Sequence, residues 1–326
     1  MILVVGGAGY IGSHVCRALR DQGIAHVVFD NLEEGFKEAL GPSELVVGDL
    51  RKAEDVVSVI KDVKPSLVMH FGAYISVGES VRQPAKYFLN NTSGVVNLLT
   101  AMAQNEVTSF VFSSTAAVYG EPEYVPIDEE HPKRPTSPYG ESKYLVERML
   151  PSFESAYGIR SVCLRYFNAS GAQPDGTIGE AHRVEEHLIP LAIKAAAGQR
   201  GALKVFGTDY PTPDGTCIRD YIHVVDLANA HLLAVSHLLD NGSTRQFNLG
   251  SGTGFSVREV IETVSRVTGL TVPYEDSDRR PGDPAQLIAS SKRIREELGW
   301  EPVFDNLERI VADAWNWHQA HPSGYA

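Results

Sequence analysis

The sequence predicts an α/β fold with a Rossmann-type, doubly wound parallel sheet, and three observations support that prediction. Apolar runs alternate with amphipathic segments from the first residue, as they do where helices connect parallel strands. The apolar runs are continuous and rich in valine, isoleucine and leucine, which is typical of strands covered on both faces. The first run leads into a glycine-rich turn, VVGGAGYIGSH.

The elements of the first half follow in order along the chain. Strands are expected at 2–7, 26–31, 44–50, 66–73, 109–120 and 160–170, the fifth of them running into a loop. Helices are expected at 10–21, 52–63 and 84–104, and from Pro138 onward. This order favours crossover connections, and therefore a parallel sheet.

The composition changes after Asn168. The stretches GAQPDGTIGEAH and GTDYPTPDGTCIRDY are rich in Gly, Pro, Asp and Thr, and we expect them to be long functional loops. Helices are expected at 223–239 and 256–269, with a strand at 245–251 between them. We therefore expect a dinucleotide-binding domain over 1–167 and a smaller α/β substrate domain over 168–326, with 220–250 returning to the first domain.

Charge and cysteine content narrow the function classes. The net charge of −12 leaves no basic footprint for nucleic acid. Cys16, Cys163 and Cys217 are far apart and odd in number, which indicates reduced thiols in a cytoplasmic protein. No apolar run is long enough to cross a membrane. Histidines and cysteines lack the spacing of metal ligands, so no metal is expected.

The glycine-rich turn and the end of the second strand together predict a dinucleotide site. Gly6, Gly9 and Gly12 leave a strand and open a helix, where the backbone can approach a pyrophosphate and the helix N-terminus favours its charge. Asp30 ends the second strand, where a carboxylate accepts hydrogen bonds from the adenosine ribose and repels a 2′-phosphate. The cofactor is therefore expected to be NAD rather than NADP. The alternative is a tight turn beside an acidic loop residue.

Further strand ends extend this site. The third strand ends at Asp49 and Leu50, which are expected to frame the adenine. The residues that end the fourth strand at the crevice are Phe71, Gly72 and Ala73.

The stretch SPYGESKY places Tyr139 and Lys143 one helical turn apart. An exposed helix face would explain this spacing without any chemistry. A nearby ammonium also favours a phenolate, and a general base works best when its pKa is near the working pH. The hydroxyl of Thr115, at the end of the fifth strand, completes a candidate catalytic set where a nicotinamide is expected to lie.

The motifs together resemble the short-chain dehydrogenase/reductase superfamily, in particular its extended branch acting on nucleotide sugars and, within that branch, the family of UDP-glucose 4-epimerases (UDP-galactose 4-epimerases). The resemblance covers essentially the whole chain. It is carried, in order, by GGAGYIGSH, DNL, GDLR, HFGAYISVGESV, FSSTAAVYG, PYGESK, RYFNASGA, HLIPL, GTDYPTPDGTCIRDYIHV and RRPGD. The first and sixth motifs mark only the superfamily, whereas YPTPDGTCIRDYIHV is much more specific.

The resemblance implies an NAD-dependent interconversion of UDP-galactose and UDP-glucose. Tyr139 would take the proton of the sugar 4-hydroxyl while hydride passes to NAD, and the 4-keto sugar would turn over before hydride returns. Lys143 would hold the nicotinamide ribose and lower the pKa of Tyr139, and Thr115 would hydrogen-bond the sugar oxygen. The resemblance adds cofactor contacts at Tyr10, Ile11, Asn31, Asn90, Ser113 and Tyr166.

The resemblance also implies a substrate site in the second domain. Arg219 and Arg280 would clamp the diphosphate with paired donors, and Asp283 would take the uridine ribose. The residues expected to line the sugar and uracil are Phe167, Asn168, Leu188 and Phe206. Read alone, RDY and RRPGD are surface loops with salt bridges. A homodimer is implied, through the helix at 84–104 and the helix that carries Tyr139.

Three positions depart from the pattern of some family members. Ile75 stands where they have a lysine near the nicotinamide, so one cofactor contact is missing. His187 stands where they have an asparagine, and we leave it out of the site. Leu287 stands where they have a tyrosine that narrows the sugar pocket, so an N-acetyl group at C2 is expected to fit.

Three rival functions stay open. A 4-epimerase of another UDP sugar (UDP-N-acetylglucosamine, UDP-glucuronate, UDP-xylose or UDP-arabinose) is the serious alternative, because the sequence does not settle which substituents fit. A 4,6-dehydratase would need acidic groups where Ala116 and Ala117 stand. A non-enzymatic NAD sensor would not need Thr115, Tyr139 and Lys143 together.

Overall fold

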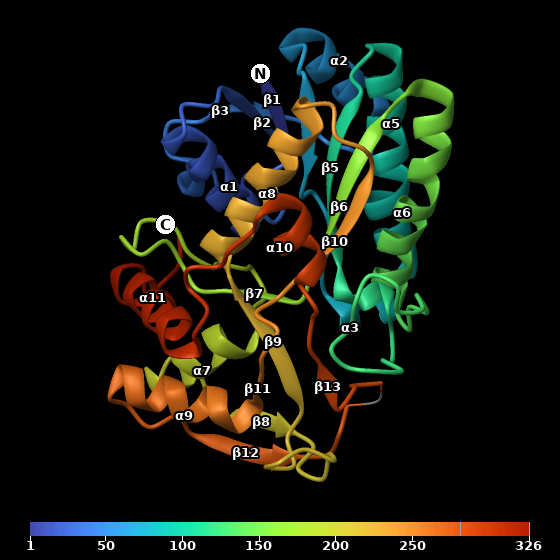
Figure 1. Ribbon diagram of the computed structural model, residues 1–326. Coiled ribbons are helices and arrows are strands. Elements are labelled where there is room, and N and C mark those ends of the chain that lie inside the picture. The colour runs from blue at the N-terminus through green and yellow to red at the C-terminus, as the bar shows by residue number, and fades with distance from the viewer. Residues whose placement is uncertain (281, 326) are drawn as a thin grey trace.

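The computed structural model describes residues 1–280 and 282–325. Within them, seven parallel strands form a central sheet that helices cover on both faces, and a smaller part of the chain lies beyond one end of that sheet (Figure 1). Within the described residues, no helix combines the length and the apolar character needed to cross a membrane.

The central sheet has the strand order β3-β2-β1-β4-β5-β6-β10, and every neighbouring pair is parallel. Its strands are β1 (Ile2–Val5), β2 (His26–Asp30), β3 (Glu44–Val47), β4 (Leu67–His70), β5 (Ser109–Thr115), β6 (Arg160–Tyr166) and β10 (Arg245–Leu249). The order reverses between β1 and β4, which creates a crevice at their carboxyl ends, where ligands of such sheets bind. The predicted fold class is confirmed.

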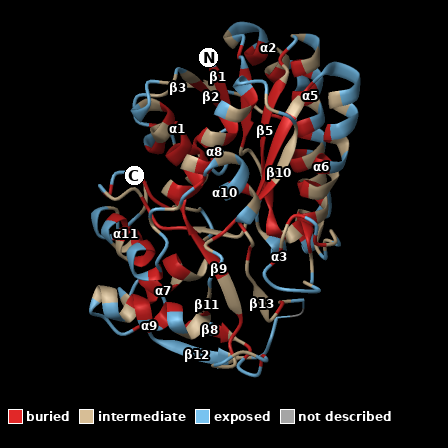
Figure 2. Cartoon of the chain, in the orientation of Figure 1, coloured by how far each residue is buried: buried red, intermediate tan, exposed pale blue. Residues whose placement is uncertain are grey.

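Two hydrophobic cores sandwich the sheet, and the strands alternate between them. Ile2 and Val4 of β1 pack in one core with α1 (Tyr10–Asp21), α8 (Val224–Leu239) and α10 (Lys292–Leu298). Leu3 and Val5 pack in the other with α2 (Ala53–Val63), α5 (Gly94–Gln104) and α6 (Pro138–Tyr157). Strand residues alternate between faces, so a strand covered on both sides has to be apolar throughout. Figure 2 shows this burial for the inner strand β5, which is red, whereas the edge strand β3 is not.

The helix expected at 84–104 is interrupted. It comprises α4 (Pro84–Tyr87), a wider π-helical turn η2 (Phe88–Ser93) and α5, after a separate short helix α3 (Val77–Arg82). The wider turn directs Asn90 and Asn91 at the loop after β4, where Asn90 Nδ2 donates to the Gly72 carbonyl at 3.4 Å and Asn91 Oδ1 accepts from the Tyr74 amide at 3.0 Å. Single π turns often occur at functional sites.

The strand expected at 160–170 also divides. β6 ends at Tyr166, and β7 (Asn168–Ser170) leaves the central sheet to pair with β9 (Ile218–His223). The chain therefore crosses from one sheet to the other at Phe167. The prediction of a loop over 207–221 was wrong for its last residues, because β9 begins at Ile218. This strand lies in the same small sheet as β11 (Gly254–Ser256) and β13 (Gln286–Leu287).

The smaller part has its own core. Helices α7 (Leu188–Ala196), α9 (Val257–Thr268) and α11 (Leu307–Ala320) pack there against the small sheet and against the pair β8 (Leu203–Phe206) and β12 (Tyr274–Ser277). Between these elements the chain returns to the central sheet, where α8 packs on α1 and β10 pairs with β6.

Candidate active site

In the glycine-rich turn after β1, two positions are too crowded for a side chain, and a third has free space beside its backbone. Gly6 has φ of +75°, and a Cβ there would lie 2.3 Å from the Gly72 amide nitrogen. A Cβ on Gly12 would lie 2.4 Å from the Gly6 carbonyl oxygen, so both positions need glycine for packing. On Gly9 the nearest atom would be 3.5 Å away, an ordinary contact. The surface at Gly9 is open to a ligand lying at the N-terminus of α1.

Asp30 ends β2 with its carboxylate held by the backbone. Oδ2 accepts from the Ala8 amide at 2.9 Å and Oδ1 accepts from the Leu32 amide at 2.8 Å. Burial raises the pKa of this carboxyl, and the two amides oppose that shift. The carboxylate is therefore fixed beside the glycine turn, where it can accept ribose hydroxyls.

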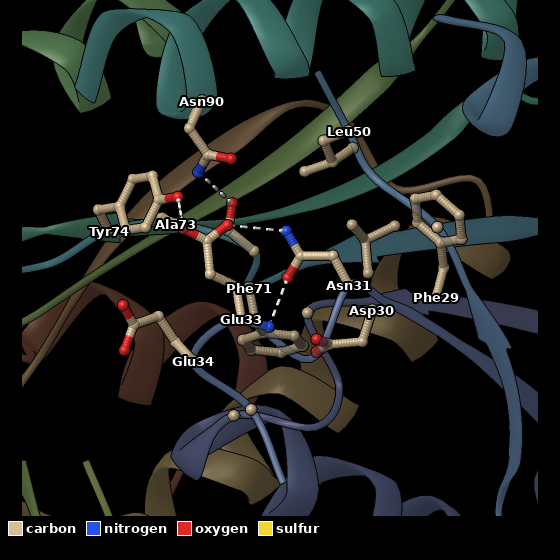
Figure 3. A pocket seen from close by; sticks show the side chains of 16 residues that line it. Phe29, Asp30, Asn31, Glu33, Glu34, Leu50, Phe71, Ala73, Tyr74 and Asn90 are labelled. Atoms are coloured by element: carbon tan, nitrogen blue, oxygen red, sulfur yellow. Dashed lines mark hydrogen bonds between the residues drawn. The ribbon is translucent and has the colours of Figure 1, made fainter. Parts of the chain in front are cut away.

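A pocket opens at the carboxyl ends of β1, β2 and β4, and Figure 3 shows its side chains. The predicted cofactor residues that line it are Gly6, Gly9, Asp30, Asn31, Leu50, Phe71, Gly72, Ala73 and Asn90. The other predicted cofactor residues do not line it: Tyr10, Ile11, Gly12, Asp49, Ser113, Tyr139, Lys143 and Tyr166. Tyr10 instead donates its hydroxyl to the Gly171 carbonyl at 2.7 Å, and Asp49 forms an ion pair with Arg51 at 2.6 Å.

Sequence reasoning missed seven residues of this pocket: Val5, Phe29, Glu33, Glu34, Gly35, Gly48 and Tyr74. Tyr74 donates to Glu33 Oε1 at 2.6 Å, and both side chains point inward (Figure 3). Arg51 bridges them, 2.8 Å from Glu33 and 3.0 Å from the Tyr74 hydroxyl. Glu33 follows the acidic end of β2 by three residues, so an extended view of that loop would have found it, whereas Tyr74 carries no local signal.

Lys143 is buried on α6, with 2% of its surface exposed. Its Nζ donates to the Ser113 carbonyl at 2.8 Å and lies 5.0 Å from the centre of the Phe112 ring. Burial lowers the pKa of Lys143 to about 7, and the charge of Glu147 one turn later opposes this. The exposed-face interpretation of the YxxxK spacing is therefore wrong for Lys143.

Tyr139 lies with Thr115 at the end of β5. Burial raises the pKa of Tyr139, and hydrogen bonding to the Thr115 hydroxyl opposes that rise. Lys143 was expected to lower this pKa, but it is not among the groups that do so here. The physical reason is that Lys143, only about half protonated at pH 7, directs its donor to a backbone carbonyl. Ser113 and Tyr166 meet beside this set, joined by a short hydrogen bond between their hydroxyls.

The expected diphosphate and ribose ligands also meet. Arg219 Nη2 lies 3.3 Å from Asp283 Oδ1, and Arg280 Nε donates to Asp283 Oδ2 at 2.8 Å. The Arg280 guanidinium stacks 4.9 Å from the centre of the Phe206 ring. Two guanidinium groups, a carboxylate and an aromatic face therefore stand together, which suits a nucleoside diphosphate.

The remaining substrate candidates surround the crossing point between the sheets. Asn168 donates to the Asp220 carbonyl at 2.8 Å, and Leu188 begins α7. Phe167 and Leu287 pack against one small apolar cluster, and β13 pairs Leu287 directly with Arg219. Ile75 is exposed.

Comparisons with known proteins agree with this geometry. Residues 2–250 match the model of the "NAD dependent epimerase/dehydratase family". A UDP-glucose 4-epimerase of Halalkalibacterium halodurans is 52% identical over 325 residues, which cover 100% of this chain and 97% of that protein.

Two solved structures extend the likeness to three dimensions. The UDP-glucose 4-epimerase of Brucella ovis, in complex with NAD, is 47% identical with a TM-score of 0.94 and covers 96% of this chain and 97% of its own. The UDP-Glc/GlcNAc 4-epimerase of Campylobacter jejuni is 41% identical with a TM-score of 0.86 and covers 98% of this chain and 99% of its own. With matches of this extent in sequence and in structure, the chain belongs to the NAD dependent epimerase/dehydratase family.

Proposed function

We propose that this chain interconverts UDP-galactose and UDP-glucose, with NAD as its resident cofactor. The observation that carries the proposal is the Tyr139 phenol beside the Thr115 hydroxyl, with Lys143 one turn further along α6. The full-length similarity to UDP-glucose 4-epimerases supports the same reaction class.

The residues fit NAD by their shape and by their donors. The open surface at Gly9 and the N-terminus of α1 would hold the pyrophosphate, and Asp30 would take the adenosine ribose. Asp30 places a carboxylate in the adenosine pocket, so a 2′-phosphate would be repelled there. Bound NAD would supply the capacity to take hydride from C4 of the sugar and to return it to the opposite face.

The protein groups would move and hold protons around that exchange. Tyr139 would take the proton of the 4-hydroxyl, and Thr115 would hold the same oxygen in line. A phenol has to lose roughly 4 kcal/mol of preference for its neutral form to titrate near pH 7. Because burial alone raises the pKa of Tyr139, the cation of Lys143 has to be redirected from the Ser113 carbonyl toward the phenolate.

The second part of the chain would hold the UDP moiety. Arg219 and Arg280 would clamp the diphosphate, and Asp283, released from those guanidinium groups, would take the uridine ribose. Phe206 would stack beside the nucleotide, while Phe167, Asn168 and Leu188 would line the remaining surface. These anchors leave the sugar free to turn between its two faces.

Turnover of UDP-galactose by the purified chain tests the proposal, with and without added NAD, read as UDP-glucose formed. We expect conversion that Tyr139→Phe lowers by about 100-fold or more, since general-base catalysis contributes about 10²–10⁴. NAD binding by that variant, measured separately, should be retained. Absence of conversion with NAD present would refute the proposal.

A 4-epimerase of another UDP sugar is the second candidate, and Leu287 favours it. Leu287 lies opposite Arg219 in the small sheet, and it is smaller than a tyrosine. The likeness to a UDP-Glc/GlcNAc 4-epimerase points the same way. UDP-N-acetylglucosamine and UDP-glucuronate run beside UDP-galactose would separate the two candidates.

We also propose a cytoplasmic homodimer that buries the outer faces of α5 and α6. Val81 of α3, Leu89 of η2 and Val96 of α5 are exposed apolar side chains, at 63%, 59% and 36%. Figure 2 shows exposed outer surfaces on both helices. Sedimentation velocity should give a dimer that Leu89→Glu dissociates. A monomer at micromolar concentration would exclude the proposed dimer.

The three buried free thiols suit a reducing compartment, which supports the cytoplasmic location.

A further inference from the structure

Two histidines and two glutamates converge in the irregular segment just before α7. Glu180, His182, Glu185 and His187 each offer one donor atom, and these atoms all lie within 4.8 Å of one another. The spacing of histidines and cysteines alone predicted no metal site. That argument left out carboxylates, which are metal ligands as well.

Four distances between histidine nitrogens and carboxylate oxygens of the cluster lie near those between the donors of a coordinated ion. His187 Nδ1 lies 2.8 Å from Glu180 Oε1 and 3.0 Å from Glu185 Oε1. His182 Nδ1 lies 3.5 Å from Glu180 Oε1 and 3.3 Å from Glu185 Oε2. Ligand bonds of about 2.0–2.1 Å in a tetrahedron put neighbouring donors roughly 3.3 Å apart. The observed distances lie on both sides of that value.

Glu180 Oε1 has ion-pair contacts with both histidines, but no aligned hydrogen bond from the described residues. Glu180 is only 5% exposed. The Nδ1 of His187 is aligned with Glu185 instead, and one ring proton cannot serve two carboxylates. A buried carboxylate oxygen needs a partner, and a cation would accept the lone pairs of all four groups at once.

The rest of the protein holds this segment in place. Arg183 Nε donates to the Glu33 carbonyl at 2.7 Å, which ties the segment to the loop after β2. The amide of Gly179 donates to the Tyr325 hydroxyl at 3.1 Å. Glu185 Oε1 accepts from the amides of Glu186 and His187 at 3.0 and 2.9 Å. The donors are thus positioned by contacts that do not depend on an ion.

We propose that Glu180, His182, Glu185 and His187 bind one first-row divalent transition-metal ion of the Zn²⁺ class. Imidazole and carboxylate donors suit such ions, and two carboxylates balance the double positive charge. The side chains of His182 and His187 are 17% and 41% exposed, which provides an entry path from solvent. The ion would not belong to the proposed catalytic groups. It would connect the start of α7 to α1, because the Tyr10 ring of α1 packs edge-on against the His182 ring, with the ring centres 6.2 Å apart.

The test is a calorimetric titration of tag-free, chelator-treated and dialysed full-length protein with Zn²⁺ alone. We expect one saturable site per chain. The double variant His182→Gln/His187→Gln should bind at least about 100-fold more weakly, because even outer partners of a metal site change affinity by about 10–100-fold. His237→Gln, on α8 with its ring bonded to the Ser243 carbonyl, is the matched control and should bind like the wild type.

Two further measurements guard against a folding artefact. Glu180→Gln keeps the shape of the side chain but removes its charge, and it should weaken Zn²⁺ binding while the far-UV circular dichroism stays unchanged. Co²⁺ should give the visible d–d bands of a four-coordinate ion in the wild type and not in the double variant. Absence of saturable binding, or equal affinity in the wild type and the double variant, would overturn the proposal. Because no sugar nucleotide is present, neither result bears on epimerisation.

Discussion

Replacing Lys143 by methionine should stabilise the unliganded chain at neutral pH. Burial lowers the pKa of Lys143 from 10.5 to about 7. One pKa unit equals about 1.4 kcal/mol, so at pH 7 burying this ammonium costs the folded state about 4 kcal/mol relative to the neutral amine. Methionine removes that cost but leaves the Ser113 carbonyl without its donor, which costs about 1–3 kcal/mol. The variant should therefore be about 1–3 kcal/mol more stable at pH 7.

The sign of the pH dependence follows from the protons that each state binds. Between about pH 7 and pH 10.5 the unfolded chain keeps the proton of Lys143 and the folded chain releases it. Wild-type stability therefore gains from this group as the pH rises through that window. The cost of burial falls to about 1 kcal/mol at pH 10, so the stability advantage of the variant should shrink by about 3 kcal/mol.

Urea unfolding followed by circular dichroism at pH 7, 8, 9 and 10 measures this difference. Bound nucleotide has to be removed first, since a ligand of the folded state adds its own stabilisation. Other titrating groups are common to both proteins and cancel in the difference. Lys61→Met, on the exposed face of α2, is the control and should show no such trend. A variant less stable at pH 7, or a difference that does not change with pH, would refute the reasoning.

Three further predictions concern the pocket and its supports. Leu287→Tyr should lower conversion of UDP-N-acetylglucosamine by about 10-fold or more, and UDP-galactose conversion should change little. Equal exclusion of UDP-N-acetylglucosamine by wild type and variant would count against a role of Leu287 in admitting the N-acetyl group. Glu147→Ala leaves the Arg165 guanidinium buried without the carboxylate now 2.6 Å away, so urea unfolding should show a loss of about 3–5 kcal/mol, and a loss below about 1 kcal/mol would contradict it. Asp30→Ala should weaken NAD binding about 10-fold and raise the NADP to NAD affinity ratio, measured by calorimetry; an unchanged ratio would argue against Asp30 as the selecting group.

Short sequence patterns predicted most of the helices and strands, because apolar period and turn-forming glycines act within one short segment of chain. The helix expected at 10–21 is α1 at Tyr10–Asp21, because its apolar period and the glycines before it lie within one short segment. The strand expected at 44–50 ends earlier, at Val47; the Gly48 amide still donates to the Asp30 carbonyl at 3.1 Å, and the chain turns from Leu50. Apolar runs mark the strands, whereas their ends depend on packing against other segments.

The wide turn at Phe88–Ser93 and the break at Phe167 carried no local signal. Both depend on partners far away in the sequence, since Asn91 bonds Tyr74 and β7 pairs with β9. The pocket residue Tyr74 was missed for the same reason, because its partner Glu33 lies 41 residues away.

The α/β class, the glycine turn with Asp30, and the spacing of Tyr139 and Lys143 can be predicted from the amino-acid sequence, because short-range sterics and hydrophobic period encode them. Three features arise only when distant segments pack together: the burial that lowers the pKa of Lys143, the joining of Arg219 and Arg280 through Asp283, and the contact of Glu180 with two histidines. Desolvation and charge pairing depend on which distant segments meet, and a linear pattern does not contain that information.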